Sequence, residues 1–251
     1  MSKLNFLTAL PVFNEFRSVN KVLDQVRSFA DHVLVVDDGS TDGTSDLLRQ
    51  RSDIIVKTHE KNQGYGAALM TAFSYAIDAN YDFIITIDCD GQHEPQRIPS
   101  FVSICENTNA DIISGSRYLQ EFNGDTLAPE QRQRVNQLIT AELNERLGLQ
   151  ITDAFCGFKA YRVSKLSKFR LTETGYAMPL ELWVQAAHHK LKIVEYAIPR
   201  IYLDNTRSFG GQLDDMQTRL DYYHLVINRS LEAVALNCVS CQAEANKENV
   251  Q

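Results

Sequence analysis

Short runs of apolar and β-branched residues alternate with longer helical patterns from residue 4 to about residue 115. This alternation is typical of a parallel sheet covered by helices, because each connection between parallel strands crosses over and needs a dozen or more residues. The expected strands lie at residues 4–11, 32–37, 54–57, 83–88 and 111–114. We therefore predict an α/β fold with a Rossmann-like, mostly parallel central sheet.

Helices are expected where apolar residues recur at 3.6-residue spacing or where a helix-start residue precedes such a pattern. Their approximate ranges are 19–29, 45–51, 64–80, 95–107, 130–147 and 212–236. The second half of the chain is less regular, and we interpret it as a continuation of the same domain. We predict a single domain over residues 1–236 and a disordered polar tail at 242–251.

Charge and hydropathy exclude some classes of partner and location. The chain has 25 Lys and Arg against 32 Asp and Glu, a net charge of -7, so we expect no nucleic-acid partner. It has no run of 18 apolar residues, and its N-terminus lacks the pattern of a signal peptide. Five cysteines form no disulfide framework. We therefore expect a cytoplasmic protein without a transmembrane segment.

Acidic residues follow three of the predicted strands at the point where each strand ends. Glu15 follows the first strand, Asp37 and Asp38 the second, and Asp88 and Asp90 the fourth. The carboxyl ends of parallel strands meet at one edge of a sheet, and ligands of open α/β sheets bind there. Carboxylates gathered at such an edge repel one another unless a cation or a donor-rich ligand lies among them.

Asp88 and Asp90 are the strongest candidates for binding a metal ion. They are two residues apart beside a glycine-containing turn, so both can approach one Mg²⁺ or Mn²⁺, and Gln92 can add a neutral oxygen. A helix cap would explain one of these acids and leave the other without a role. A cation held by so few protein oxygens is completed by water and substrate phosphates, which indicates a nucleoside diphosphate as the ligand. Cys89 lies between the two acids, and its thiol is expected to pack rather than to bind a hard cation.

Two further features concern the nucleotide. Asp37 or Asp38 offers an acceptor either to the imide N–H of uracil or to the N1–H and amino group of guanine, and the sequence does not choose between them. Gly64 and Gly66, at a helix start, permit close backbone approach and present N–H donors to an anion. Their spacing is neither that of a P-loop nor that of a dinucleotide fingerprint.

Six segments, taken together and in this order, resemble the inverting glycosyltransferases of family 2. They are PVFNE (11–15), VVDDGSTDGT (35–44), KNQGYGAAL (61–69), DCDGQHEP (88–95), SGSR (114–117) and CGFKAYR (156–162). More closely, residues 4–205 resemble the branch of dolichol-phosphate mannose synthases and polyprenyl-phosphate sugar transferases. The resemblance implies a GT-A fold, a nucleoside-diphosphate sugar donor such as a GDP- or UDP-sugar, a divalent metal, and direct displacement at the anomeric carbon. It divides the chain into a nucleotide-binding half at about 1–116 and an acceptor half at about 117–236.

The resemblance also implies roles for individual residues. The donor pocket would be lined by Pro11, Phe13, Glu15, Asp37, Asp38, Gly64, Asp88 and Cys89, and the metal would be held by Asp88, Asp90 and Gln92. Arg117 matches a position near the acceptor or the sugar, and Arg207 matches a basic residue of a loop that closes over the diphosphate. Arg132, Arg134 and Asn136 fall on a helix that meets the acceptor phosphate at the membrane surface in lipid-linked members.

The acceptor is either a polyprenyl phosphate, reached by peripheral contact with the cytosolic face of a membrane, or a hydroxyl of a soluble glycan or protein. An ionised phosphate needs no deprotonation, whereas a hydroxyl needs a general base. Asp153 is the first candidate for such a base and Glu181 the second. Two rival functions are a catalytically silent sugar-nucleotide-binding protein and a nucleotidyltransferase. The segment PVFNEFRSVN is not the glycine-rich basic loop that a nucleotidyltransferase would need.

Overall fold

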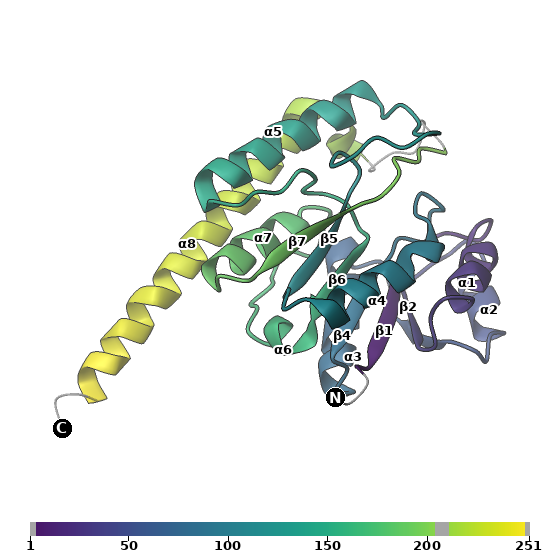
Figure 1. Ribbon diagram of the computed structural model, residues 1–251, viewed down its shortest axis with the longest axis horizontal. Coiled ribbons are helices and arrows are strands. Elements are labelled where there is room, and N and C mark those ends of the chain that lie inside the picture. Colours follow the sequence, from purple (N-terminus) through teal and green to yellow (C-terminus); the bar gives the residue numbers. More distant parts are fainter. Residues whose placement is uncertain (1–3, 204–210, 249–251) are drawn as a thin grey trace.

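The computed structural model describes residues 4–203 and 211–248, with side chains described to residue 236 apart from residue 212. Its centre is a sheet of seven strands in the order β3-β2-β1-β4-β6-β5-β7 (Figure 1). The strands are β1 (Phe6–Val12), β2 (Val33–Asp37), β3 (Ile55–Thr58), β4 (Phe83–Thr86), β5 (Ile112–Ser116), β6 (Lys159–Arg162) and β7 (Ile193–Ala197). All neighbouring pairs are parallel except those that β6 makes with β4 and β5.

The prediction of a mostly parallel α/β sheet is confirmed, and each of the five expected strands is present. The antiparallel strand β6 was not predicted, because its four residues KAYR are too short to show a period-2 pattern. Both β6 and β7 lie in the part of the chain whose sequence pattern was irregular. Strand β6 is inserted between β4 and β5, so segments far apart in the sequence become neighbours at the centre of the sheet.

Helices cover both faces of the sheet (Figure 1). They are α1 (Val19–Arg27), α2 (Thr44–Arg49), α3 (Tyr65–Asp78), α4 (Ile98–Asn107), α5 (Glu130–Leu147), α6 (Val163–Leu166), α7 (Met178–His188) and α8 (Met216–Glu248), with short 3-10 turns η1 (Pro95–Arg97) and η2 (Gly211–Asp214). Helices α1 and α4 pack on one face, whereas α3, α5, α7 and α8 contribute to the core on the other. Such double cover explains why the strands read as continuous apolar runs.

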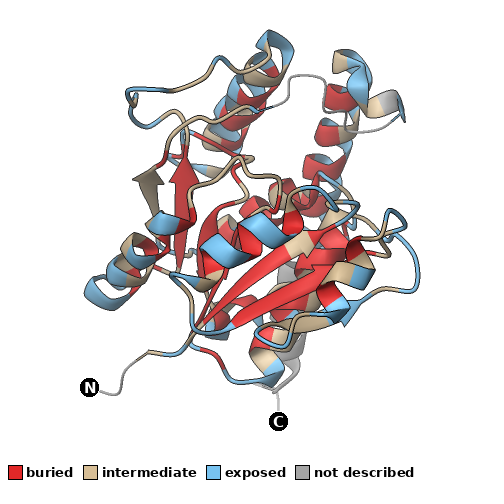
Figure 2. Cartoon of the chain, turned by 90° about the vertical axis from the view of Figure 1, so that its right-hand side faces the viewer, coloured by how far each residue is buried: buried red, intermediate tan, exposed pale blue. Residues whose placement is uncertain are grey.

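Strand β2 shows how the sequence builds the two cores. Val33 and Val35 point to the α1 and α4 side, and Leu34 and Val36 point to the α3 side. Because successive side chains of a strand face opposite ways, an apolar residue is needed at every position. All five residues of this strand are buried, and Figure 2 shows the interior strands of the sheet in red, as buried.

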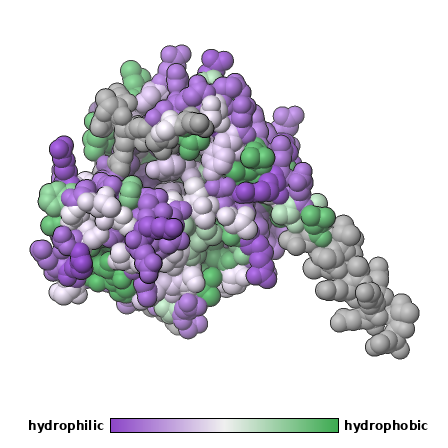
Figure 3. Space-filling model, turned by 180° about the vertical axis from the view of Figure 1, so that it is seen from behind, coloured by the Kyte–Doolittle hydropathy of each residue, from purple (hydrophilic) through white to green (hydrophobic). Residues whose placement is uncertain are grey.

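Helix α8 extends away from the rest of the chain in Figure 1 and continues to Glu248. From the sequence we expected this helix to end near residue 236 and a disordered tail to begin at residue 242. The described helix instead continues past both positions. The alanine, glutamate and lysine residues of QAEANKE favour helix even where no apolar face exists. None of the described helices has the length and apolar character needed to cross a membrane. On the face in Figure 3, hydrophobic side chains lie scattered among hydrophilic ones.

The topology places several chain segments at one edge of the sheet. Strands β1, β2, β4 and β5 run in the same direction, so their carboxyl ends share this edge. Strand β6 runs the opposite way, and its beginning therefore lies at the same edge. Residues after four strands and before a fifth thus converge there, as expected for the ligand-binding edge of an open sheet.

Candidate active site

A cavity of about 470 Å³ opens at this edge. Its walls contain most of the residues that the sequence singled out: Pro11, Phe13, Glu15, Asp38, Gly64, Asp88, Cys89, Asp90, Gln92, His93, Arg117, Arg132 and Asn136. The first ten of these follow β1, β2 and β4 or begin α3, and the others come from the second half of the chain. The fold therefore brings the predicted donor, metal and acceptor residues into one space.

Asp88 lies just beyond β4 and is held from two sides. Its Oδ1 accepts a hydrogen bond from the Tyr65 hydroxyl at 3.0 Å, and its Oδ2 lies 3.3 Å from Nε2 of His93. Burial would raise the pKa of Asp88, but the hydrogen bond and charge of His93 outweigh burial and hold this pKa below its usual value. Asp88 is therefore an ionised carboxylate at neutral pH.

Asp90 and Gln92 complete the acidic end of the cavity. Asp90 Oδ1 accepts a hydrogen bond from the backbone N–H of Gln92 at 2.9 Å, which fixes the turn that carries both residues. The described residues contain no cluster of three His, Cys, Asp or Glu side chains suited to a metal ion. A cation here would bind two carboxylates and the Gln92 amide oxygen, with positions left for a ligand's phosphates. That oxygen-only, incomplete donor set fits Mg²⁺ or Mn²⁺.

Cys89 lies between these acids and has a different role. Its side chain is buried and packs in the core on the α1 and α4 face of the sheet. The expectation that the thiol packs rather than binds a hard cation agrees with this position. Cys89 is at the cavity wall because Asp88 and Asp90, on either side of it in the sequence, line the cavity.

Asp38 and Asp37 follow β2 but lie in different environments. Asp38 lines the cavity and accepts hydrogen bonds from His59, the Gln63 N–H and the Gly64 N–H. Asp37 is fully buried, does not line the cavity, and binds the Ser40 N–H and the Ser45 hydroxyl. The expectation that Asp37 contacts the donor therefore does not fit the structure, because its oxygens organise the turn after β2.

The glycines of the site permit close contacts between protein segments. A Cβ on Gly64 would lie 2.4 Å from the Thr174 carbonyl oxygen, and one on Gly66 would lie 2.4 Å from that of Glu173. The Gly64 N–H donates to Asp38, so it is engaged within the protein. These two glycines are thus required by the packing of α3 against residues 173–175, whereas the sequence suggested approach to an anion.

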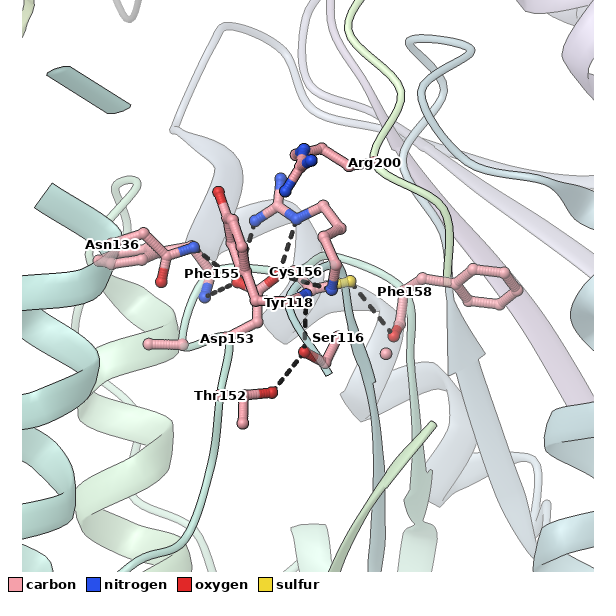
Figure 4. A network of polar contacts seen from close by, with 12 residues as sticks. Ser116, Tyr118, Asn136, Thr152, Asp153, Phe155, Cys156, Phe158 and Arg200 are labelled. Atoms are coloured by element: carbon pink, nitrogen blue, oxygen red, sulfur yellow. Dashed lines mark hydrogen bonds and ion pairs between the residues drawn. The ribbon is translucent and has the colours of Figure 1, made fainter. Parts of the chain in front are cut away.

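Arg117, which lines the cavity, forms a buried ion pair with Asp153. Nε and Nη2 of Arg117 donate to the two oxygens of Asp153 at 2.7 and 3.0 Å, and Asn136 Nδ2 donates to Asp153 Oδ1 at 2.8 Å. Figure 4 shows Asn136 and Asp153 pointing toward each other within this network. Burial alone would raise the pKa of Asp153, but the charge of Arg117 and these hydrogen bonds hold it well below the usual range.

Neither residue expected to act as a general base faces the cavity. Asp153 has no exposed surface and does not line the cavity, and its depressed pKa makes it a poor proton acceptor. Glu181 is also buried, and its oxygens bind the backbone N–H groups of Thr172 and Glu173 and the Thr172 hydroxyl. Both carboxylates hold structure in place, and the expectation of a base at either position does not fit this geometry.

The lining residues from Arg117 onward give the cavity a basic and aromatic wall. Arg117, Arg132 of α5 and Arg219 of α8 line it, together with Tyr176, Tyr202 and Tyr223. Burial raises the pKa of Tyr223 to about 12, against the opposing charges of Arg219 and Arg132, so both guanidinium groups lie near this hydroxyl. Arg134 is exposed and does not line the cavity. Arg207 lies outside the described residues.

Sequence reasoning missed Tyr65, His59 and Arg219. Tyr65 acts through Asp88, which is 23 residues away in the sequence, and His59 acts through Asp38, which is 21 residues away. Pairings across such separations leave no local pattern in the sequence. Arg219 is 3% exposed although it falls on the apolar face of α8 between Met216 and Tyr223. A charged residue on such a face is a signal that could have identified it.

Comparison with known proteins identifies the family of the chain. The model of glycosyl transferase family 2 matches residues 8–170, more than half of the chain. The chain is 29% identical over 221 residues to an undecaprenyl-phosphate mannosyltransferase of Micrococcus luteus, covering 83% of this chain and 89% of that protein. It is 27% identical over 222 residues to a UDP-N-acetylglucosamine–dolichyl-phosphate N-acetylglucosaminyltransferase of Methanococcus voltae, covering 80% and 87% of the two chains.

Among solved structures, the chain is similar to glucosyl-3-phosphoglycerate synthase of Mycobacterium tuberculosis in complex with Mn²⁺, UDP and glucosyl-3-phosphoglycerate. The TM-score is 0.70 at 18% identity, and the match covers 91% of this chain and 80% of the other. This likeness confirms the predicted GT-A fold.

Proposed function

The chain belongs to glycosyl transferase family 2, and we propose that it transfers a hexose from a nucleoside-diphosphate sugar to a polyprenyl phosphate, with inversion and with the help of Mg²⁺ or Mn²⁺. Relatives named for transfer to undecaprenyl or dolichyl phosphate support this class of acceptor. The acids and arginines that line one cavity support a reaction between two phosphorylated substrates.

The donor is assigned to the acidic end of the cavity. Pro11, Phe13, Glu15 and Asp38 line the part next to β1 and β2, where the nucleoside would bind. Asp88, Asp90 and Gln92 would hold the divalent cation together with the diphosphate. When bound, the cation would act as a Lewis acid on the leaving diphosphate. Tyr65 and His93 keep the Asp88 carboxylate oriented for this purpose.

The observation that carries the assignment of a phosphate acceptor is the chemistry of the lining contributed from Arg117 onward. Between Arg117 and Tyr223, the described lining residues include three arginines and no carboxylate. A hydroxyl acceptor would need a general base on this side. A phosphate is already ionised, and guanidinium groups bind it with charge-assisted hydrogen bonds. The acceptor oxygen can then attack the anomeric carbon in one displacement without losing a proton.

Asp153 and Asn136 are assigned positioning roles in this reaction. Together they fix the Arg117 side chain through a bidentate ion pair. A guanidinium held in this way loses little further freedom when an anion arrives, which favours catalysis by preorganisation. Because a polyprenyl phosphate resides in a membrane, the proposal includes a peripheral contact between this wall of the protein and the membrane surface.

Steady-state kinetics with a short-chain polyprenyl phosphate test the assignment of the basic wall. We expect Arg132→Gln and Arg219→Gln each to raise the KM for the lipid phosphate about tenfold, which is the loss of one charge-assisted contact. The affinity for the nucleotide should change less than about twofold, because neither arginine is among the residues assigned to the donor. Arg134→Gln, two residues from Arg132 on the same helix and outside the cavity, is the matched control. Weakened nucleotide binding with an unchanged KM for the acceptor would contradict the proposal.

A further inference from the structure

Asp38 stands where the base of the nucleotide is assigned, and its carboxylate is nearly saturated by the protein. Its Oδ1 accepts from Nδ1 of His59 at 2.6 Å and from the Gln63 N–H at 2.9 Å, and its Oδ2 accepts from the Gly64 N–H at 2.8 Å. The side chain is buried apart from the part that lines the cavity. Any base that binds here must use the hydrogen-bonding capacity that remains.

The lone pairs of the Asp38 carboxylate show how many further hydrogen bonds it can accept. An ionised carboxylate offers about four acceptor sites, two on each oxygen. Three protein donors occupy both sites of Oδ1 and one site of Oδ2. Asp38 can therefore accept one further hydrogen bond, at Oδ2, and it cannot accept a pair of parallel N–H groups across both oxygens.

From this geometry we propose that the donor nucleotide carries a base with a single imide N–H flanked by carbonyls, which is the chemistry of uracil and thymine. The inference rests on the proposed function, because it concerns the same donor site. It decides between the two bases that the sequence left open.

The hydrogen-bonding edges of the five bases explain the choice. Uracil and thymine present one N–H between two carbonyl oxygens, which matches the single acceptor left on Asp38. Guanine presents N1–H and an amino group side by side, and Asp38 can accept only one of these two donors. Cytosine and adenine present a ring nitrogen lone pair at the corresponding position, and this lone pair would face a carboxylate. A buried polar mismatch of this kind discriminates strongly between ligands.

Neighbouring residues can serve the rest of a pyrimidine. Asn62 lines the cavity next to the Gln63 backbone that binds Asp38, and its side-chain amide can donate to a flanking carbonyl. Pro11 and the partly exposed ring of Phe13 provide apolar surface in the same part of the cavity.

His59 limits the number of hydrogen bonds that Asp38 can still accept from a ligand. An ionised carboxylate is an acceptor, so Nδ1 of His59 carries the proton in its hydrogen bond with Asp38. The other ring nitrogen lies 2.9 Å from the Thr71 hydroxyl of α3, which fixes the ring plane. His59 does not line the cavity, so it acts as a positioning residue for specificity through Asp38.

Isothermal titration of the intact protein with UDP, dTDP, GDP, CDP and ADP, each with Mn²⁺, tests the proposal. We expect UDP or dTDP to bind about tenfold more tightly, or better, than the three other nucleotides. The ratio of UDP to dTDP identifies which of the two imide bases the site accepts. GDP binding as tightly as UDP would overturn this inference and leave the proposed transferase activity standing. No binding by any of the five would overturn the proposed function itself.

A variant of His59 tests whether its hydrogen bond to Asp38 causes the preference for uracil or thymine. His59→Phe removes one donor from Asp38 Oδ1, so Oδ1 regains a free site beside the one already free on Oδ2, and guanine can be accepted across both oxygens. We expect the ratio of GDP to UDP dissociation constants to fall at least about threefold. His32→Phe makes the same substitution at an exposed position whose ring bonds Tyr81, outside the cavity, and should keep the parent ratio. An unchanged ratio in a folded His59→Phe protein would refute the role of His59.

Discussion

The carboxylate of Asp88 is enclosed by groups from three separate parts of the chain. Tyr65 and His93 bind its two oxygens, and Gly157, just before β6, packs against it so closely that an added Cβ would lie 2.1 Å from Oδ2. This enclosure fixes the direction in which Asp88 presents its remaining lone pairs. Asp90, held by the turn to Gln92, completes the pair.

Loss of Asp90 should abolish turnover while the fold is retained. In Asp90→Asn the cation would lose one of its two carboxylates, and we expect transferase activity to fall at least about 100-fold, beyond the effect typical of outer-shell partners. Initial rates measured across a range of Mn²⁺ concentrations check this. Asp46→Asn, on the exposed surface of α2, is the control and should retain full activity. Activity of Asp90→Asn above a tenth of the parent value would contradict the metal assignment.

The Arg117–Asp153 pair makes a different prediction, about stability. Asp153→Asn leaves the Arg117 guanidinium, which is 15% exposed, without its counter-charge, and we expect a loss of about 3–5 kcal/mol in the free energy of unfolding. Asp46→Asn, which breaks an exposed pair with Arg49, should cost about 1 kcal/mol or less. Urea denaturation at pH 7 measures both.

The same pair sets a pH dependence whose sign follows from the lowered pKa of Asp153. Such a group contributes stability that is complete above its unfolded pKa, about 4, and that is lost as the pH falls through the folded pKa. The difference in unfolding free energy between the parent and Asp153→Asn should therefore be constant from pH 7 to about pH 5 and shrink below pH 4. A difference that grows toward acid would show that Asp153 is not ionised in the folded protein.

At the scale of secondary structure, the start of α3 is fixed by its contact with residues 173–175. The Ala67 N–H donates to the Thr174 carbonyl at 3.1 Å, and the glycines at 64 and 66 leave room for this approach. Glu173 in turn binds Arg229 and Tyr222 of α8. The donor side and the α8 side of the cavity are therefore linked through one short segment.

Gly66→Ala tests this link. A Cβ there would lie 2.4 Å from the Glu173 carbonyl oxygen and 2.8 Å from Cβ of Met178, so the segment must move. We expect a loss of about 1–3 kcal/mol in stability, although alanine is otherwise preferred to glycine within a helix. Thermal unfolding measures it, with Ser74→Ala on the exposed face of the same helix as control. A Gly66→Ala protein as stable as the parent would show that the contact does not constrain α3.

The elements that could be predicted from the sequence are those with a strong local pattern. The five strands of the first half read as apolar runs, and the acids after them fall at one edge because parallel strands share a direction. Strand β6 could not be predicted, since four residues give no period and the residues that pair with it lie 45 or more positions away in the sequence. The same long-range pairing places Gly157 against Asp88, and the 36-residue separation of Arg117 and Asp153 hid their ion pair.

At the scale of the whole molecule, the cavity separates negative from positive charge. The net charge of -7 says nothing of this separation, since it averages over a surface on which most charges are solvated. The cavity has carboxylates where β1, β2 and β4 end and arginines where β5, α5 and α8 meet it. A divalent cation among the carboxylates and a phosphate among the arginines would neutralise both ends, which agrees with two anionic substrates meeting in one space.

The direct test of this account is transfer from a radiolabelled nucleoside-diphosphate sugar to a polyprenyl phosphate, compared with the polyprenol of the same chain length. Both acceptors are presented in the same detergent micelles with Mn²⁺, and each reaction is repeated with EDTA. We predict a labelled lipid with the phosphate acceptor, a rate at least about 100-fold lower with the polyprenol, and no product in EDTA. Equal transfer to the polyprenol, or transfer that persists in EDTA, would contradict a metal-dependent reaction on a phosphate acceptor.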